Sequence, residues 1–283
     1  DTLKQRGLLI DDVSHAQKTL DTISYFRLAG YWRHLEADRS THRFKKGSKF
    51  TDITDAYYFD KQLRALLFSA IQTIEVVVRT KIIKHFAHTY GAFWFMNEEC
   101  ATNSSRFAAN LAIVGKEVAR SHDDFIKEHF RKYSEPELPP VWKTLEVVSM
   151  GTLSKLYSNF SDATAKHGIA REFGLNHHEF LRSWLECLAV IRNCCAHHSR
   201  LFNRVFPIKP QMPVRLSGVW ITDFSFREQT LYPQLCYLVY WLNSISADNT
   251  FVKDFKHLLN EHPTVNTRLM GFPAGWENEP LWK

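Results

Sequence analysis

The sequence predicts an all-α protein, a helical bundle with additional helices and a C-terminal tail docked on it. Apolar residues recur at three- and four-residue spacing along most of the chain, which is the period of an α-helix. Glycine or proline residues end several of these patterns. A hydrophobic fraction of 45% and an aromatic fraction of 14% are typical of a packed globular protein rather than a disordered chain.

Residues 1–50 are expected to form an N-terminal helical extension that carries a basic loop. The helix is predicted over 12–29, with Ser14 as its cap and Gly30 at its end. Residues 39–50 are polar and basic, which predicts an exposed loop. Five cations in it are candidates for contact with backbone phosphates, although a solvated loop explains them equally well. They are Arg39, Arg43, Lys45, Lys46 and Lys49.

Residues 51–262 are expected to form the helical core. The longest apolar pattern begins at Asp52 and stops at Gly91, as one long helix or two joined end to end. Pro207, Pro210 and Pro213 predict an irregular segment, and a short strand pair is a further expectation around 214–221. The remaining helices are predicted over 103–131, 142–160, 162–173, 178–199, 229–246 and 249–259.

Large apolar residues in residues 263–283 predict that this tail packs on the core. Trp142, Trp184 and Trp241 lie in apolar helical patterns and are predicted core residues. Tyr31, Trp32 and Arg33 could together stack on a nucleic-acid base. For Tyr31 and Trp32 we favour core packing.

The charge balance favours an anionic partner. The net charge is +6, which indicates nucleic acid first and a membrane surface second. The five cysteines are odd in number and form no CxxC, which argues against a disulfide framework and a zinc ribbon. No membrane span and no secretory signal is evident. We therefore expect a soluble cytoplasmic protein with no membrane partner and no cofactor.

Residues 192–197 (RNCCAH) combine side chains that suit RNA cleavage. On a helix, Asn193, His197 and Arg200 lie at i, i+4 and i+7 and share a face, and Arg192 is long enough to reach it. Imidazole titrates near neutrality, so His197 suits proton transfer at the 2′-OH or the leaving 5′-oxygen without a metal ion. Arg192 would hold the phosphate, and Asn193 would orient the imidazole. His198 is a supporting candidate.

The bare spacing of arginine and histidine is weak evidence by itself. It recurs in three other places, at Arg27 and His34, Arg79 and His85, and Arg171 and His177. An alternative interpretation is a helix end at which the side chains of His197, His198 and Arg200 bind the last carbonyls and complement the helix dipole.

Four ordered blocks provide stronger evidence. They are DKQLR to IEVVVR (60–79), PVW to GTLSKLY (140–157), IRNCCAHHSRLFNR (191–204) and MGFP to Trp276 (270–276). Together they resemble the Abi-like family of bacterial abortive-infection proteins (AbiD and AbiF type), part of the HEPN superfamily. The resemblance implies an HEPN-like helical core, RNA as substrate or partner, and a phage-defence or toxin role.

The resemblance also implies roles for individual residues. Arg192 and His197 occupy the R-x4-6-H motif of the superfamily, and Asn193 its polar second position. Because such sites generally combine two facing motifs and this chain has one, a homodimer with a composite site is implied. The expected function is a metal-independent endoribonuclease toxin, and an antitoxin is a further expected partner. The alternatives are a non-cleaving RNA-binding protein that partners a dedicated non-coding RNA, and a purely structural helical dimer.

Two further sets of residues have competing interpretations. Glu75 and Arg79 favour an intrahelical ion pair; alternatively Glu75 faces His197 across a pocket and orients its imidazole. A zinc site would draw on His177, His178, His197, His198, Cys187, Cys194 and Cys195. Among these, Cys194 and His198 are a workable i, i+4 ligand pair, but no second pair has the spacing of a structural site, so no metal site is expected.

Overall fold

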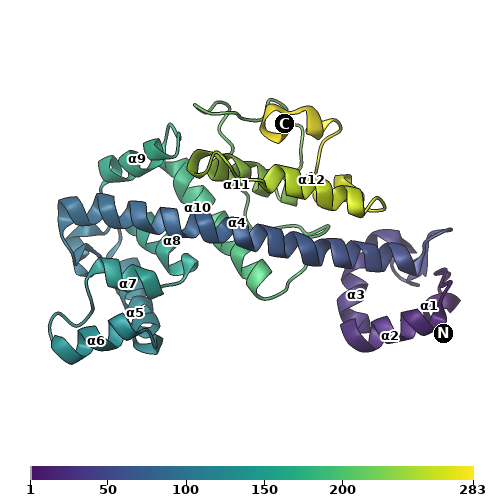
Figure 1. Cartoon of the computed structure of the whole chain (residues 1–283), viewed down its shortest axis with the longest axis horizontal. Helices are drawn as coiled ribbons and strands as arrows, with labels where there is room; N and C mark the ends of the chain where they lie inside the picture. Colours follow the sequence, from purple (N-terminus) through teal and green to yellow (C-terminus); the bar gives the residue numbers. More distant parts are fainter. Residues whose placement is uncertain (1) are drawn as a thin grey trace.

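Helices make up nearly all of the regular structure, which confirms the predicted all-α class (Figure 1). The computed structural model describes residues 2–283. The sheet in this part of the chain is an antiparallel hairpin of β1 (Glu36–Asp38) and β2 (Arg43–Phe44). The helices are α1 (Thr2–Gln5), α2 (Val13–Ile23), α3 (Tyr25–Trp32), α4 (Phe50–Tyr90), α5 (Ser104–Arg120), α6 (Asp124–Lys132), α7 (Val141–Val147), α8 (Met150–Asn159), α9 (Ala163–Glu172), α10 (His178–Ala196), α11 (Leu231–Ile245) and α12 (Phe251–Glu261).

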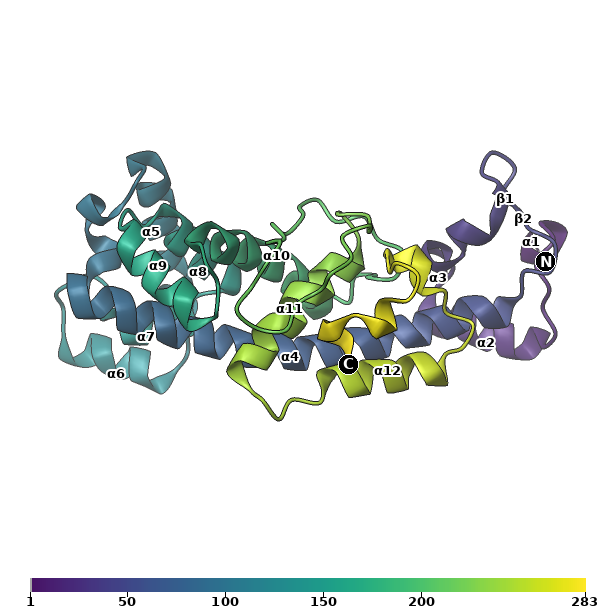
Figure 2. The ribbon, with the colours of Figure 1, turned by 90° about the horizontal axis from the view of Figure 1, so that it is seen from above.

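Helix α4 is the axis of the molecule, about 60 Å long at 1.5 Å per residue. Figures 1 and 2 show α1–α3 at its N-terminal end, α5–α9 at its C-terminal end, and α11 and α12 along its middle. Its apolar stripe is buried from Phe50 to Phe86, so both ends are anchored in the core. The helix is continuous and ends at Gly91, where φ is 81°. Of the two expectations, one long helix is therefore confirmed.

Three predicted helices are each interrupted, because serine residues offer their side chains to the backbone. Ser24, with φ of 71°, ends α2 and caps α3 by accepting the N–H of Arg27. Ser121 separates α5 from α6, and Ser149 separates α7 from α8 by accepting the N–H of Thr152. The predicted start and end of the first helix were also wrong. The cap is Asp12 rather than Ser14, and Gly30 lies inside α3.

The expected strand pair around 214–221 was wrong. Residues 201–230 are irregular, and the hairpin forms instead in the basic segment expected to be a loop. Trp142 was also misplaced: it is 51% exposed. Val141, Thr144 and Leu145 define the buried face of α7, and Trp142 lies off that face.

The C-terminal third supplies the densest part of the core. Residues 231–242 of α11 are all buried, and Trp184 and Trp241 are fully buried, as predicted. The tail docks as predicted: Trp276 and Trp282 pack on Phe255 of α12, with ring centroids 5.9 and 5.8 Å away. No described helix combines the length and the apolar character needed to cross a bilayer.

Candidate functional site

Helix α10 ends at Ala196, and His197 is its C-cap. The chain then turns through His198, which has the left-handed φ of 54°. The N–H of Ser199 donates to the Cys194 carbonyl at 2.8 Å, and the N–H of His198 donates to the Cys195 carbonyl at 3.2 Å. This pair of bonds is a Schellman motif. Main-chain N–H groups therefore occupy these carbonyls, and the imidazoles of His197 and His198 are exposed.

The turn separates Arg200 from the two residues, Asn193 and His197, with which it was expected to share a helix face. Asn193 and His197 lie one turn apart and both are exposed, and neither side chain has a hydrogen-bond partner within the described chain. Arg200 does not join them, because the helix has already ended. Its guanidinium donates to the carbonyls of Phe202 and of Asn203, the latter at 2.8 Å. The expected shared face with Arg200 was wrong, and Arg200 instead holds the following loop together.

Arg192 approaches a carboxylate from α4 without a hydrogen bond to it. Its Nε lies 3.9 Å from Oε2 of Glu75, and its side chain is 32% exposed. The other oxygen of Glu75 accepts from Arg79 at 2.8 Å, which is the predicted intrahelical pair. Arg79 also donates to the Val148 carbonyl at 3.1 Å. In the described chain no hydrogen bond or ion pair joins Glu75 to His197, so Glu75 pairs with Arg79, lies near Arg192 and does not orient the imidazole.

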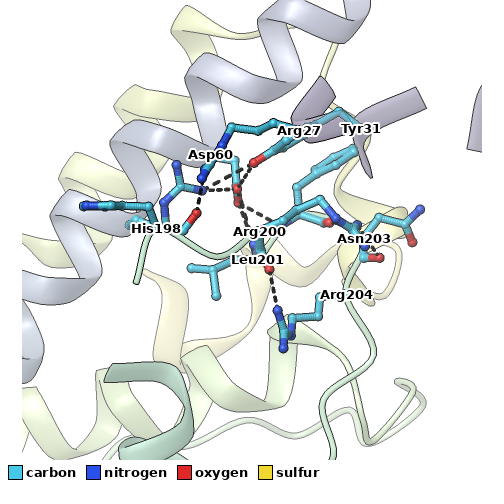
Figure 3. Close-up of polar contacts among 10 residues, drawn as sticks. Arg27, Tyr31, Asp60, His198, Arg200, Leu201, Asn203 and Arg204 are labelled. Carbon is cyan, nitrogen blue, oxygen red and sulfur yellow. Dashed lines mark hydrogen bonds and ion pairs between the residues drawn. The ribbon is translucent and has the colours of Figure 1, made fainter. Parts of the chain in front are cut away.

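The loop after the turn is anchored by Asp60, a fully buried carboxylate on α4 (Figure 3). Asp60 accepts from the N–H of Phe202 at 2.8 Å and the N–H of Leu201 at 3.1 Å. Two side chains complete its shell. Arg64, one turn further along α4, forms a buried ion pair with it, and the Tyr31 hydroxyl donates to it at 2.6 Å.

Burial and the surrounding hydrogen-bond donors have opposite effects on the pKa of Asp60. Burial raises the pKa of Asp60, whereas Arg64, Tyr31 and the two N–H groups act against that rise by favouring the carboxylate. Burial, and next the Asp60 charge, raise the pKa of Tyr31 far above its ordinary value, so Tyr31 remains a donor. Tyr31 is buried, as is Trp32, which confirms core packing for both residues.

Helix α3 also contacts the turn directly. Figure 3 shows Arg27 reaching the main chain of His198, where its guanidinium donates to the carbonyl at 2.9 Å. Gly30 lies beneath Arg200, and a Cβ at Gly30 would stand 3.2 Å from the Arg200 Nε. The N-terminal extension therefore packs against the turn and contributes contacts that fix its position.

The predicted basic loop is the β1–β2 hairpin and its flanks. Asp38 closes the hairpin by accepting from Ser40 and Thr41. Five exposed cations surround it, and none takes part in an ion pair within residues 2–283. These are Arg39, Arg43, Lys45, Lys46 and Lys49. They stand at the α1–α3 end of the molecule, as Figure 2 shows.

The cysteines near the site are not available as ligands. Cys187, Cys194 and Cys195 are buried, and burial raises the pKa of Cys187 and of Cys195 to about 12. The zinc site considered from the sequence is excluded for a second reason: His178 and His197 lie at opposite ends of α10, about 28 Å apart along the helix.

Near the end of α10 an exposed amide and an exposed imidazole lie one turn apart, and the residue before the amide carries a partly exposed guanidinium. The residues that hold this end in place, Asp60, Tyr31, Arg64 and Arg27, were not predicted as site residues. One pattern pointed to them: Asp60 and Arg64 are an i, i+4 charge pair inside an apolar stripe, and such a pair is buried only with partners.

Comparison with family models identifies a family for this chain. The model described as Abi-like protein matches residues 18–203, which is more than half of the chain. The matched range includes Asp60, Arg192 and His197, and the fourth block, 270–276, lies outside it. Comparison with curated proteins and with solved structures gives no match.

Proposed function

Because the chain belongs to the Abi-like protein family, we propose that it is an RNA-targeting abortive-infection protein and a metal-independent endoribonuclease of the HEPN type. The observation that carries the proposal is the end of α10. There His197 and Asn193 are exposed without partners one helical turn apart, and Arg192, the residue before Asn193, lies within ion-pair distance of Glu75. These are the groups needed to cleave RNA through its own 2′-OH.

In the proposed reaction an imidazole removes the 2′-OH proton, and the 2′-oxygen attacks phosphorus. The bond to the 5′-oxygen breaks, and a second acid protonates that oxygen. The products are a 2′,3′-cyclic phosphate and a 5′-hydroxyl. Arg192 offsets the charge that develops on the phosphoryl oxygens, and Asn193 orients the imidazole or the strand.

A second copy of the chain would supply the second imidazole. One chain offers His197 on an open surface, and five surface hollows of the described chain are lined by other residues. Two exposed apolar residues adjoin Arg27 and Glu75 in sequence: Phe26 is 87% exposed and Val76 is 58% exposed. A second copy packed against this region would remove them from water. We therefore propose a homodimer whose two motifs form one composite site.

The basic hairpin would hold the RNA backbone. Its exposed cations are free of ion pairs within the described chain, so each can neutralise a phosphate. This surface also favours the alternative function, a protein that binds a dedicated non-coding RNA without cutting it. An antitoxin would be a further partner of a toxin in an uninfected cell.

One experiment separates the two functions. Labelled RNA is incubated in EDTA, and in parallel with Mg²⁺ and no EDTA, with the parent protein, with His197→Ala, and with His122→Ala, which removes an exposed histidine far from the motif. Cleavage by the parent and the control, with cyclic-phosphate ends and no cleavage by His197→Ala, is the expected result. Binding without cleavage by all three would establish the alternative. Cleavage that stops in EDTA would exclude the metal-independent mechanism.

The composite site has its own test. Parent and His197→Ala chains are co-expressed in varied ratios, and the cleavage rate is measured at constant total protein. A site that needs both copies loses activity with the square of the parent fraction. A linear decline would show that each chain acts alone.

A further inference from the structure

Three imidazoles meet at the opposite end of α10. His167 lies on α9, His177 is the N-cap of α10, and His178 is the first residue of that helix. One nitrogen from each lies within 4.8 Å of the other two. The ring centroids are 4.5 to 4.9 Å apart.

The cluster contains an unsatisfied buried nitrogen. Nδ1 of His178 is buried and has no hydrogen-bond partner in the described chain, although Oε1 of Glu179 lies 3.2 Å away outside hydrogen-bond geometry. Buried polar atoms without a partner are rare and call for one. His177 is exposed, so the cluster opens to solvent on that side.

Neighbouring cations are already engaged. Arg182 donates to Glu179 at 2.6 Å and to Glu186 at 2.8 Å. The ammonium group of Lys166 lies 5.9 Å from the centre of the Tyr157 ring. The charges of Glu179 and Glu186 therefore offset the guanidinium beside the histidines, and a cation can enter.

We propose that His167, His177 and His178 bind one Zn²⁺ ion, with water in the fourth position, and thereby join α9 to the start of α10. Zinc is bound in proteins by three histidine ligands with water in the fourth position, and imidazole is a ligand that suits this metal ion. The sequence expectation of no metal site overlooked His167, because only the packing of α9 on α10 brings it to the other two.

Binding requires one exchange. Nδ1 of His177 accepts the N–H of Glu179 at 3.2 Å and caps the helix. Coordination through either nitrogen of His177 gives up this bond, because a metal-bound neutral imidazole carries its proton on the other nitrogen. Asparagine is a preferred N-cap that lacks the imidazole, so His177→Asn removes the ligand and keeps the cap.

The test uses the full chain without an affinity tag. Zinc binding is measured by titration calorimetry and by the rise in unfolding temperature, and Co²⁺ is added as a visible probe of four-coordinate geometry. Three variants are compared with the parent: His177→Asn, His167→Gln and the control His257→Gln, which alters an exposed histidine on α12.

The parent and the control should bind one ion, raise their unfolding temperature with zinc and give the absorption of four-coordinate Co²⁺. Each ligand variant should bind at least ~10-fold more weakly, the lower bound for loss of an outer-shell partner. Equal binding by the parent and both ligand variants, or no binding by the parent, would overturn the proposal. The nuclease test is run in EDTA and its site is at the other end of α10, so the two proposals stand or fall separately.

Discussion

Replacing Asp60 by Asn tests whether the turn after α10 is held from α4. The substitution keeps the shape of the side chain and one acceptor oxygen, which can still receive the N–H of Phe202. It removes the charge that pairs with Arg64, whose side chain is only 7% exposed. It also leaves the Tyr31 hydroxyl without a carboxylate to donate to.

The size of the effect follows from this burial. Removing one partner of a buried ion pair leaves an uncompensated buried charge, which lowers the free energy of unfolding by about 3–5 kcal/mol. Tyr31→Phe removes the hydrogen bond to the same carboxylate, together with the longer bond that the hydroxyl accepts from Arg64 at 3.4 Å, and should lower the free energy of unfolding by about 1.5–3 kcal/mol. Asp60→Asn should therefore be the more severe of the two.

The assay is urea unfolding followed by tryptophan fluorescence, with hydrogen exchange of the peptide that contains Leu201 and Phe202. Asp60→Asn should lower the urea midpoint without changing the slope and should speed exchange in that peptide. Glu128→Gln, which breaks an exposed pair with Lys132, is the control and should leave both measurements unchanged. A loss below about 1 kcal/mol for Asp60→Asn, or protected amides at 201 and 202, would refute the anchor.

Other predictions concern packing, pH and salt. Gly30→Val should lower the free energy of unfolding by about 1–3 kcal/mol, because its side chain enters the space of Arg200; a urea midpoint equal to that of the parent would contradict this. Lys81, and then His85, hold the pKa of Glu172 at about 2, against an ordinary value of 4.5. A lowered pKa stabilises the fold above pH 4.5, and this contribution is lost as pH falls toward 2. Between these pH values the unfolding temperature of the parent should therefore fall more steeply than that of Glu172→Gln. Parallel curves for the two proteins would exclude a stabilising role for the Glu172 charge. Reversing the charge of three hairpin cations should reduce the slope of log binding constant against log salt concentration for single-stranded RNA by about 2. Reversing three exposed cations elsewhere should leave that slope unchanged. An equal reduction by both sets would exclude the hairpin as the RNA-binding surface. The hairpin set is Arg39, Arg43 and Lys46, and the matched set is Lys116, Arg120 and Lys253.

Apolar periodicity predicted the long elements because burial and helix period agree over many turns. The stripe of α4 from Phe59 to Ile82 is one example: its members are buried, except Leu66 and Val77, which are partly buried and pack against the core. Interruptions were missed where one side chain decides the backbone. Ser24 ends α2 through its left-handed backbone and caps the start of α3 with its hydroxyl, and the apolar pattern continues past it without a sign of the break.

The candidate site was predictable in its residues but not in its geometry. Asn193 and His197 are one turn apart as expected. The position of Arg200 was wrong because it depends on where the helix ends, and the left-handed residue at that end is His198 rather than a glycine. The role of Asp60 depends on a contact with the chain 141 residues later, which no local pattern reveals.

That separation has a consequence for the order of synthesis. Translation proceeds at ~5–20 residues per second, so Asp60 leaves the peptidyl-transferase centre about 7–30 s before the amides that it accepts. Nascent chains that stop before residue 201 carry Arg192 and His197 on a helix whose end has no anchor. For a protein proposed to be toxic, the turn is ordered only once the ribosome has passed it, and incomplete translation products lack an organised site.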